Sequence, residues 1–166
     1  MDVTVEPLTP AAFAPFGDVL CCADNSSESI NQGFTQKFAD LATLDVSQSG
    51  GRPAVHIFRS TPPELPFTIG QLERHPLGSQ AFMPLGDQPY LVVVAPPGEL
   101  DESAIRIFLA SPNQGVHYRP GTWHHFSLAL NAVSDFLVMD RLGPGANCDE
   151  RALSQSLIIT REDLPW

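Results

Sequence analysis

Pro120-Gly121-Thr122-Trp123-His124-His125 places a tight turn directly before two histidines, in a chain that is otherwise aliphatic and strand-like. The following residues continue this stretch as a predicted strand, whose side chains alternate between two faces. His124 shares its face with an apolar set that we expect to line a barrel interior, namely Phe126, Leu128 and Leu130. His125 is expected to point away unless a bulge turns it. The stretch therefore predicts one inward-facing histidine, His124.

The rest of the chain is predicted to form further short strands. Sixteen prolines and twelve glycines disfavour a helical bundle, because proline breaks helix interiors and both residues favour turns. There is no room for the helical crossovers of about a dozen residues that parallel βαβ units require. The predicted strands are Phe34–Phe38, Val55–Arg59, Phe67–Glu73, Ala81–Pro84, Tyr90–Ala95, Ile105–Leu109, Phe126–Leu130 and Phe136–Met139. We predict an all-β antiparallel sandwich or barrel with a short helix between Thr9-Pro10 and Phe16-Gly17.

Composition limits the classes of partner. The 166 residues suit a single domain, 1–166, with its own core. A formal net charge of −10, with only one lysine, disfavours binding to nucleic acid or to anionic membranes. The chain has no expected secretory signal or membrane span, and three cysteines without metal-ligand spacing fit reduced thiols. These features predict a cytoplasmic protein.

A second segment supplies partners for His124. Glu73 and His75 are two residues apart, so a strand would point both side chains to one face. A bend at Pro76–Ser79 would return Gln80 to that face on the adjoining strand. A buried carboxylate and two imidazoles that share one interior indicate a functional site. His56 and His117, in contrast, are expected to be hydrogen-bonded structural residues.

The two segments resemble the two cupin motifs in their spacing. Glu73 and His75 take the places of two histidines, Gln80 that of the usual glutamate and Gly86 that of the closing glycine; Pro120–His124 matches the second motif. This resemblance implies a cupin-like antiparallel β-barrel, also described as a double-stranded β-helix or jelly roll. It also implies a divalent metal held by Glu73, His75, Gln80 and His124. Because an amide is a weak, neutral oxygen ligand, a low metal affinity is expected.

A narrower resemblance covers nearly the whole chain. It is carried by Glu73–Phe82, Gln114-Gly115-Val116, Trp123-His124-His125, Asp135-Phe136-Leu137, Asp140-Arg141 and Asn147-Cys148-Asp149. These stretches resemble the ureidoglycolate lyase family of allantoin and purine catabolism. The resemblance implies a homodimer that cleaves (S)-ureidoglycolate to glyoxylate and urea. It further implies a divalent metal, nickel among those associated with the family, and no organic cofactor.

Other functions remain open at this point. An amidohydrolase acting on the same substrate would release ammonia, a cupin sensor would bind a small organic acid without turnover, and the fold alone also fits a sugar isomerase or epimerase. Cleavage of ureidoglycolate requires a base and an acid beside one carbon.

The resemblance implies roles for particular residues in that cleavage. A metal could activate the substrate hydroxyl, or Glu73 or His75 could serve as the base and His124 as the acid. His125 is a further acid–base candidate.

The substrate carboxylate needs its own partner. Arg59 and Arg141 are the candidates for a bidentate contact, with a surface ion pair as the alternative for each. Asn31 and Tyr118 are candidates for groups that orient the substrate.

Overall fold

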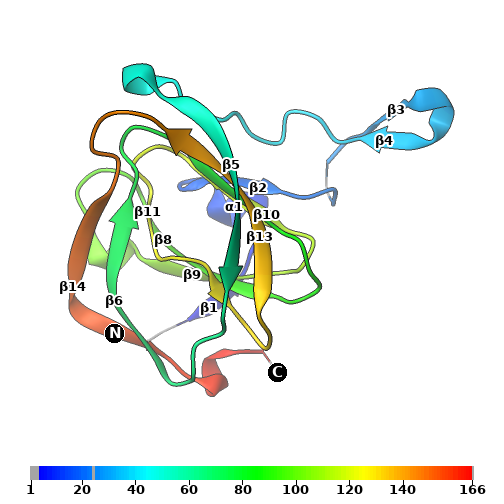
Figure 1. Ribbon diagram of the computed structural model, residues 1–166. Helices are drawn as coiled ribbons and strands as arrows, with labels where there is room; N and C mark the ends of the chain where they lie inside the picture. The colour runs from blue at the N-terminus through cyan, green and yellow to red at the C-terminus, as the bar shows by residue number, and fades with distance from the viewer. Residues whose placement is uncertain (1–3, 24, 166) are drawn as a thin grey trace.

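The computed structural model describes residues 4–23 and 25–165, so residues 1–3, Asp24 and Trp166 of the predicted domain lie outside the described residues. Within the described part, a seven-stranded sheet and a five-stranded sheet curl toward each other to form a half-barrel (Figure 1). A separate two-stranded hairpin projects sideways from the half-barrel. The expected all-β, cupin-like fold is confirmed.

The first sheet has the strand order β1-β9-β8-β11-β6-β14, with β12 also paired to β8, and the second has the order β2-β10-β7-β13-β5. The strands are β1 (Val5–Pro7), β2 (Gly17–Leu20), β3 (Glu28–Ile30), β4 (Thr35–Lys37), β5 (Arg52–Ser60), β6 (Phe67–Arg74), β7 (Gln80–Pro84), β8 (Tyr90–Ala95), β9 (Arg106–Ala110), β10 (Gly115–Tyr118), β11 (Trp123–His124), β12 (Leu128–Ala129), β13 (Ser134–Leu142) and β14 (Asp149–Ile159). The helix α1 (Pro10–Phe13) is joined by the 3₁₀ turns η1 (Asn31–Gly33), η2 (Gln48–Gly50), η3 (Glu102–Ala104) and η4 (Arg161–Asp163). No helix in residues 4–23 or 25–165 has the length and apolar character needed to cross a membrane.

Strand β8 explains how the core is organised. All six of its residues are buried, because both of its faces are covered. Tyr90, Val92 and Val94 pack between the two sheets, whereas the alternate residues of β8 pack in a second apolar cluster on the other face of the first sheet. A strand buried on both faces has a continuous apolar sequence, as β8 has. The face of β8 that carries Val94 therefore defines the interior between the sheets.

Most of the predicted elements are present. Thr9 caps α1 by accepting a hydrogen bond from the backbone N–H of Ala12 at 3.2 Å. The Tyr90–Ala95 strand has the predicted bounds, and Val55–Arg59 and Phe136–Met139 lie inside longer strands. The predicted Phe34–Phe38 strand is shorter, Thr35–Lys37, and belongs to the projecting hairpin.

The predicted Phe126–Leu130 strand is present only in part, as β12 (Leu128–Ala129). The ladder of β11 ends at His124, and only Leu128 and Ala129 resume pairing with β8. Phe126 is 58% exposed and does not belong to the interior set. The chain becomes irregular here, so simple alternation cannot be extended from His124 through Phe126.

Among the strands that have no counterpart in the predictions are β2, β10 and the eleven-residue β14. Strand β14 pairs with β6, with a register shift between Ala152 and Leu157. It carries few apolar residues before Leu157 and is largely exposed along its first half. The expected alternation of an amphipathic strand is therefore weak in its sequence.

Replacing Phe136 tests the core between the sheets. Its side chain is fully buried, and its ring centroid lies 5.1 Å from that of Tyr90. We expect Phe136→Ala to lower the free energy of unfolding by about 3–5 kcal/mol, measured by chemical denaturation. Phe126→Ala is the matched control, because an exposed ring should change stability by no more than about 0.5 kcal/mol. Equal losses in the two variants would contradict this assignment of core and surface.

Candidate active site

Strand pairing brings Glu73 and His124 together. His124 lies opposite Val94 on one side and opposite Glu73 on the other. Directly paired residues point to the same face of a sheet, so both side chains share the Val94 face, toward the interior. One potential ligand atom from each of Glu73, His75 and His124 lies within 4.8 Å of the others. We call these three residues the interior cluster.

Carbonyl groups fix the tautomers of both imidazoles. Nδ1 of His75 lies 2.7 Å from the carbonyl oxygen of Asn147, and Nδ1 of His124 lies 3.2 Å from that of His125. Because a carbonyl only accepts, each Nδ1 must carry the proton and donate it. In the neutral form of each ring, Nε2 is then an unprotonated acceptor, and in both rings it is buried without a hydrogen-bond partner. Two such lone pairs are what a divalent metal takes from neutral histidine.

Gln80 adds a neutral oxygen to this interior. It is directly paired with Tyr118 across β7 and β10, and the ring of Tyr118 stacks on His124 at a centroid distance of 4.5 Å and an angle of 7°. Gln80 is buried, its Nε2 donates to Asp140 at 3.2 Å, and its Oε1 has no partner. With the cluster, it completes a donor set of two imidazoles, a carboxylate and an amide oxygen. These donor types fit a divalent metal.

Burial sets the charges in the cluster. Burial raises the pKa of Glu73; the nearby His75 opposes this shift and Glu150 adds to it. Burial, with a smaller contribution from His75, lowers the pKa of His124 to about 3. Nδ1 of His124 lies 3.8 Å from a carboxylate oxygen of Glu73, but a neutral ring at this distance forms neither an ion pair nor a hydrogen bond. At neutral pH, His124 is therefore suited to act as a ligand or acceptor.

His125 and Tyr118 occupy different surroundings. His125 is buried, packs edge-on against Phe67 at 5.8 Å and has a pKa lowered by burial. It is not one of the three residues whose ligand atoms converge. Tyr118 lies against the cluster, and burial, with the nearby Glu73 carboxylate, raises the pKa of its phenol. Tyr118 thus presents a protonated hydroxyl near Glu73.

The two candidate arginines lie in different environments. Arg59 has 72% of its side chain exposed and forms a double hydrogen bond with Asp135, the surface ion pair considered as its alternative role. Asp135 is five positions along β13 from Asp140, which contacts Gln80. Arg59 therefore lies well away from the interior cluster.

Arg141 is buried, and its guanidinium donates to the carbonyl groups of Gln48, Ser49 and Pro144. Its Nη1 is buried and has no partner. The backbone at Gly78 approaches so closely that an added Cβ would lie 2.6 Å from Cβ of Arg141, which explains why glycine occupies this bend. Arg141 is thus held rigidly with one donor unused.

Asn31 lies on the projecting hairpin (Figure 1), where its side chain donates to Thr35. In this chain, Asn31 is not brought to the interior cluster. The hairpin also carries Phe34, with 89% of the residue exposed.

A cavity of about 310 Å³ connects His75 to Arg141. It is lined by His75, Ser79, Asp140, Arg141, Asn147 and Cys148. Sequence reasoning did not assign roles to Asp140, Asn147 or Cys148, although all three lie in stretches that carry the family resemblance. No general spacing rule identifies them, since Asp140 and Asn147 contact residues on distant segments of the chain. Asn147 also accepts a hydrogen bond from the backbone N–H of Leu77 at 2.7 Å.

Two other histidines are hydrogen-bonded, as expected. His56 lies 3.1 Å from Asp140, and His117 lies 3.0 Å from Asp18. His56 thus contacts the residue that holds Gln80. His56 therefore contacts the candidate site only indirectly, through Asp140.

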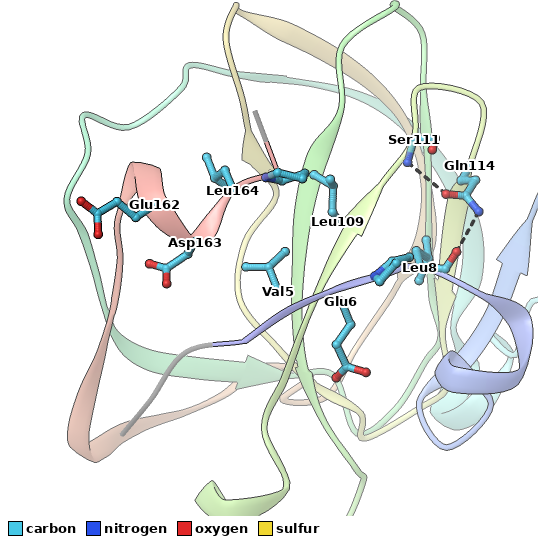
Figure 2. Close-up of a pocket in the computed structure, with 11 residues that line it drawn as sticks. Val5, Glu6, Leu8, Leu109, Ser111, Gln114, Glu162, Asp163 and Leu164 are labelled. Carbon is cyan, nitrogen blue, oxygen red and sulfur yellow. Dashed lines mark hydrogen bonds between the residues drawn. The ribbon is translucent and has the colours of Figure 1, made fainter.

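A second cavity, of about 390 Å³, lies between β1 and the C-terminal turn (Figure 2). It shares no residue with the first cavity. The amide of Gln114, at one edge of this cavity, is already satisfied, because it accepts from Ser111 and donates to the carbonyl of Leu8. The cavity near His75 is therefore the better candidate for the active site.

Comparison with known proteins shows the family of the chain. Residues 1–160 match a family model described as ureidoglycolate lyase. A ureidoglycolate lyase from Burkholderia mallei is 55% identical over 162 residues, covering 98% of this chain and 95% of the relative. The Pseudomonas syringae pv. tomato protein of the same name is 48% identical over 164 residues, covering 98% and 96%, respectively. The chain belongs to the ureidoglycolate lyase family.

Proposed function

We propose that this protein is a ureidoglycolate lyase that cleaves (S)-ureidoglycolate to glyoxylate and urea in allantoin and purine nitrogen catabolism. The observation that carries the proposal is the interior cluster, which places a carboxyl of raised pKa beside two imidazoles, and the pKa of one of these, His124, is lowered. Membership of the ureidoglycolate lyase family supplies the substrate class. The described chain would work as one catalytic domain, 1–166.

The reaction transfers a proton within the substrate. The hydroxyl and the ureido nitrogen share one carbon, so cleavage removes the hydroxyl proton, forms the carbonyl of glyoxylate and returns a proton to the departing nitrogen. Without a bound metal, Glu73 takes the hydroxyl proton in this scheme and then delivers it to the nitrogen. A carboxyl of raised pKa suits both steps, because a general acid–base group works best with a pKa near the operating pH. No external nucleophile and no net proton are consumed.

The donor set also supports a bound divalent metal. Glu73, His75, Gln80 and His124 would hold it, and nickel is the ion that we propose first. When bound, such an ion would polarise the carboxylate and hydroxyl oxygens of the substrate. The lowered pKa of His124 favours this ligand role over a role as the acid. Tyr118, with its protonated hydroxyl, is the group that we propose to orient the substrate.

Arg141 is the better of the two arginines for binding the substrate carboxylate, because it lines the cavity beside His75 and its Nη1 is unused. We expect Arg141→Lys to raise KM about 10- to 100-fold, the effect of losing a hydrogen bond to a charged group. Arg59→Lys should leave KM within about twofold of wild type, since its surface ion pair lies elsewhere. Steady-state kinetics on both variants, each checked for its fold by circular dichroism, decides between them. A raised KM only in the Arg59 variant would reverse this assignment.

Product analysis tests the reaction. Racemic ureidoglycolate should be half consumed, with glyoxylate and urea formed in equal amounts and without ammonia. Ammonia in place of urea would instead show an amidohydrolase. Binding of the substrate without any product would show a non-catalytic cupin.

We also propose a homodimer located in the cytoplasm. Val55 and Ile57 are exposed on β5, an edge strand of the second sheet, and Phe34 is exposed on the hairpin. Exposed apolar residues and an unpaired edge favour association with another chain. Sedimentation equilibrium tests the proposal, and a monomer at micromolar concentration would contradict it.

The thiols bear on the proposed cytoplasmic location. Cys22 and Cys148, which are free thiols, fit a reducing compartment.

A further inference from the structure

Asp140 is in a position to control how Gln80 faces the site. Both of its carboxylate oxygens are engaged, since Oδ1 lies 3.1 Å from Nε2 of His56 and Oδ2 accepts from Nε2 of Gln80 at 3.2 Å. An ionised carboxylate only accepts hydrogen bonds. The nitrogen of the Gln80 amide must therefore face Asp140. The amide oxygen must face the other way, where it is buried and without a partner.

The same contact disfavours a glutamate at position 80. A carboxylate there would stand about 3.2 Å from that of Asp140, the present distance between Gln80 and Asp140. Two carboxylates at this separation offer only acceptors to each other, so the hydrogen bond between positions 80 and 140 would be lost. Asp140 thus favours glutamine over glutamate at position 80, and Glu73 remains the one carboxylate of the donor set.

A single carboxylate has a consequence for the substrate. A divalent ion held by Glu73, Gln80 and two neutral imidazoles keeps a net charge of about +1 by simple addition of charges. A second carboxylate would cancel that charge and weaken the attraction for an anionic substrate. The neutral amide therefore lowers metal affinity while preserving the positive potential of the site.

We propose that Asp140 is a positioning residue that orients the Gln80 amide oxygen toward the metal and excludes glutamate from position 80. The expected effect of Asp140 on substrate binding rests on the proposed function. Its effect on metal binding is independent of the reaction.

The experiment compares Asp140→Asn, Gln80→Glu and the double variant. Nickel is titrated calorimetrically into metal-depleted protein, and thermal unfolding is measured without metal. Asp140→Asn lets the Gln80 amide turn over, because an asparagine amide at position 140 can donate as well as accept, so we expect nickel affinity to fall about 10- to 100-fold. Gln80→Glu should lower the Tm of the metal-free protein by about 4 °C or more.

The double variant provides the rescue. The carboxylate introduced at position 80 could then accept from the amide introduced at position 140, which restores the hydrogen bond with donor and acceptor exchanged. We expect the Tm to recover to within about 2 °C of wild type. We also expect tighter nickel binding than in wild type, together with a raised KM for ureidoglycolate.

Asp135→Asn is the matched control, because Asp135 lies five residues earlier on β13 and pairs with Arg59 on the surface. It should leave nickel affinity unchanged. Wild-type nickel affinity in Asp140→Asn, or purely additive Tm changes, would overturn the inference. If the metal results hold but wild-type protein leaves ureidoglycolate intact, the proposed function fails and the positioning role stands.

Discussion

Replacing Glu73 with glutamine is expected to lower kcat about 10³-fold or more. The change removes the group that accepts the hydroxyl proton, and general acid–base groups contribute about 10²- to 10⁴-fold. It also replaces a charged donor of the metal site with a neutral one. Glyoxylate and urea formation under saturating substrate measures the effect.

The neighbouring strand provides a matched control for this variant. Glu150 is paired directly with Glu73 but is exposed. Glu150→Gln should therefore lower kcat by less than about tenfold, because Glu150 only adds to the raised pKa of Glu73. Wild-type turnover in Glu73→Gln, or an equal loss in both variants, would remove Glu73 from the mechanism.

The raised pKa of Glu73 also predicts that the Glu73→Gln variant is more stable than the metal-free wild type at high pH. Burial makes the native state hold this proton more tightly than the unfolded chain, whose carboxyl has a pKa near its ordinary value of 4.5. Stability therefore falls as pH rises through the window between the unfolded and the native pKa. Above that window, the ionised carboxylate destabilises the metal-free protein. Glu73→Gln should then unfold at a higher temperature than wild type at pH 8 in chelator, and at a similar temperature at pH 4.

Replacing His124 with alanine is expected to remove both metal binding and turnover. Loss of a residue that merely supports a metal ligand lowers affinity about 10- to 100-fold, so loss of a ligand should exceed 100-fold. Turnover should fall about 10³-fold, because the metal and the adjacent base act on the same substrate oxygens. Nickel titration and product assays measure the two effects separately.

Two other histidines control for the loss of a buried ring. His117 is buried and bonded to Asp18, outside the interior cluster, so His117→Asn should retain turnover. His125→Ala tests the second histidine of the pair, and we expect a loss of less than about tenfold because its ring packs against Phe67. A larger loss in His125→Ala than in His124→Ala would reverse their roles. Circular dichroism of each variant confirms that the fold is retained.

Part of this site could be predicted from local sequence. Glu73 and His75 are two residues apart, and the structure brings both to one cluster, as strand periodicity indicates. The aliphatic run Tyr90–Ala95 predicted a central strand with its correct bounds. Both predictions depend on properties that a short segment carries by itself.

Other features depended on contacts between distant segments. The alternation from His124 through Phe126 failed because the strand ladder ends at His124. The sequence favoured neither Arg59 nor Arg141, and burial of Arg141 beside the cavity distinguishes them. Asp140 received no role from sequence, because its importance comes from facing Gln80 across β7 and β13.

Local sequence patterns are enough to predict that the chain forms short strands, that Glu73 and His75 share a face, and that His124 follows a turn. The pairing of β11 with β6, which sets His124 opposite Glu73, is visible only in the folded chain. The physical reason is the range of each effect. Alternation of side chains is a local consequence of extended backbone, whereas strand pairing depends on how the whole chain buries its apolar faces.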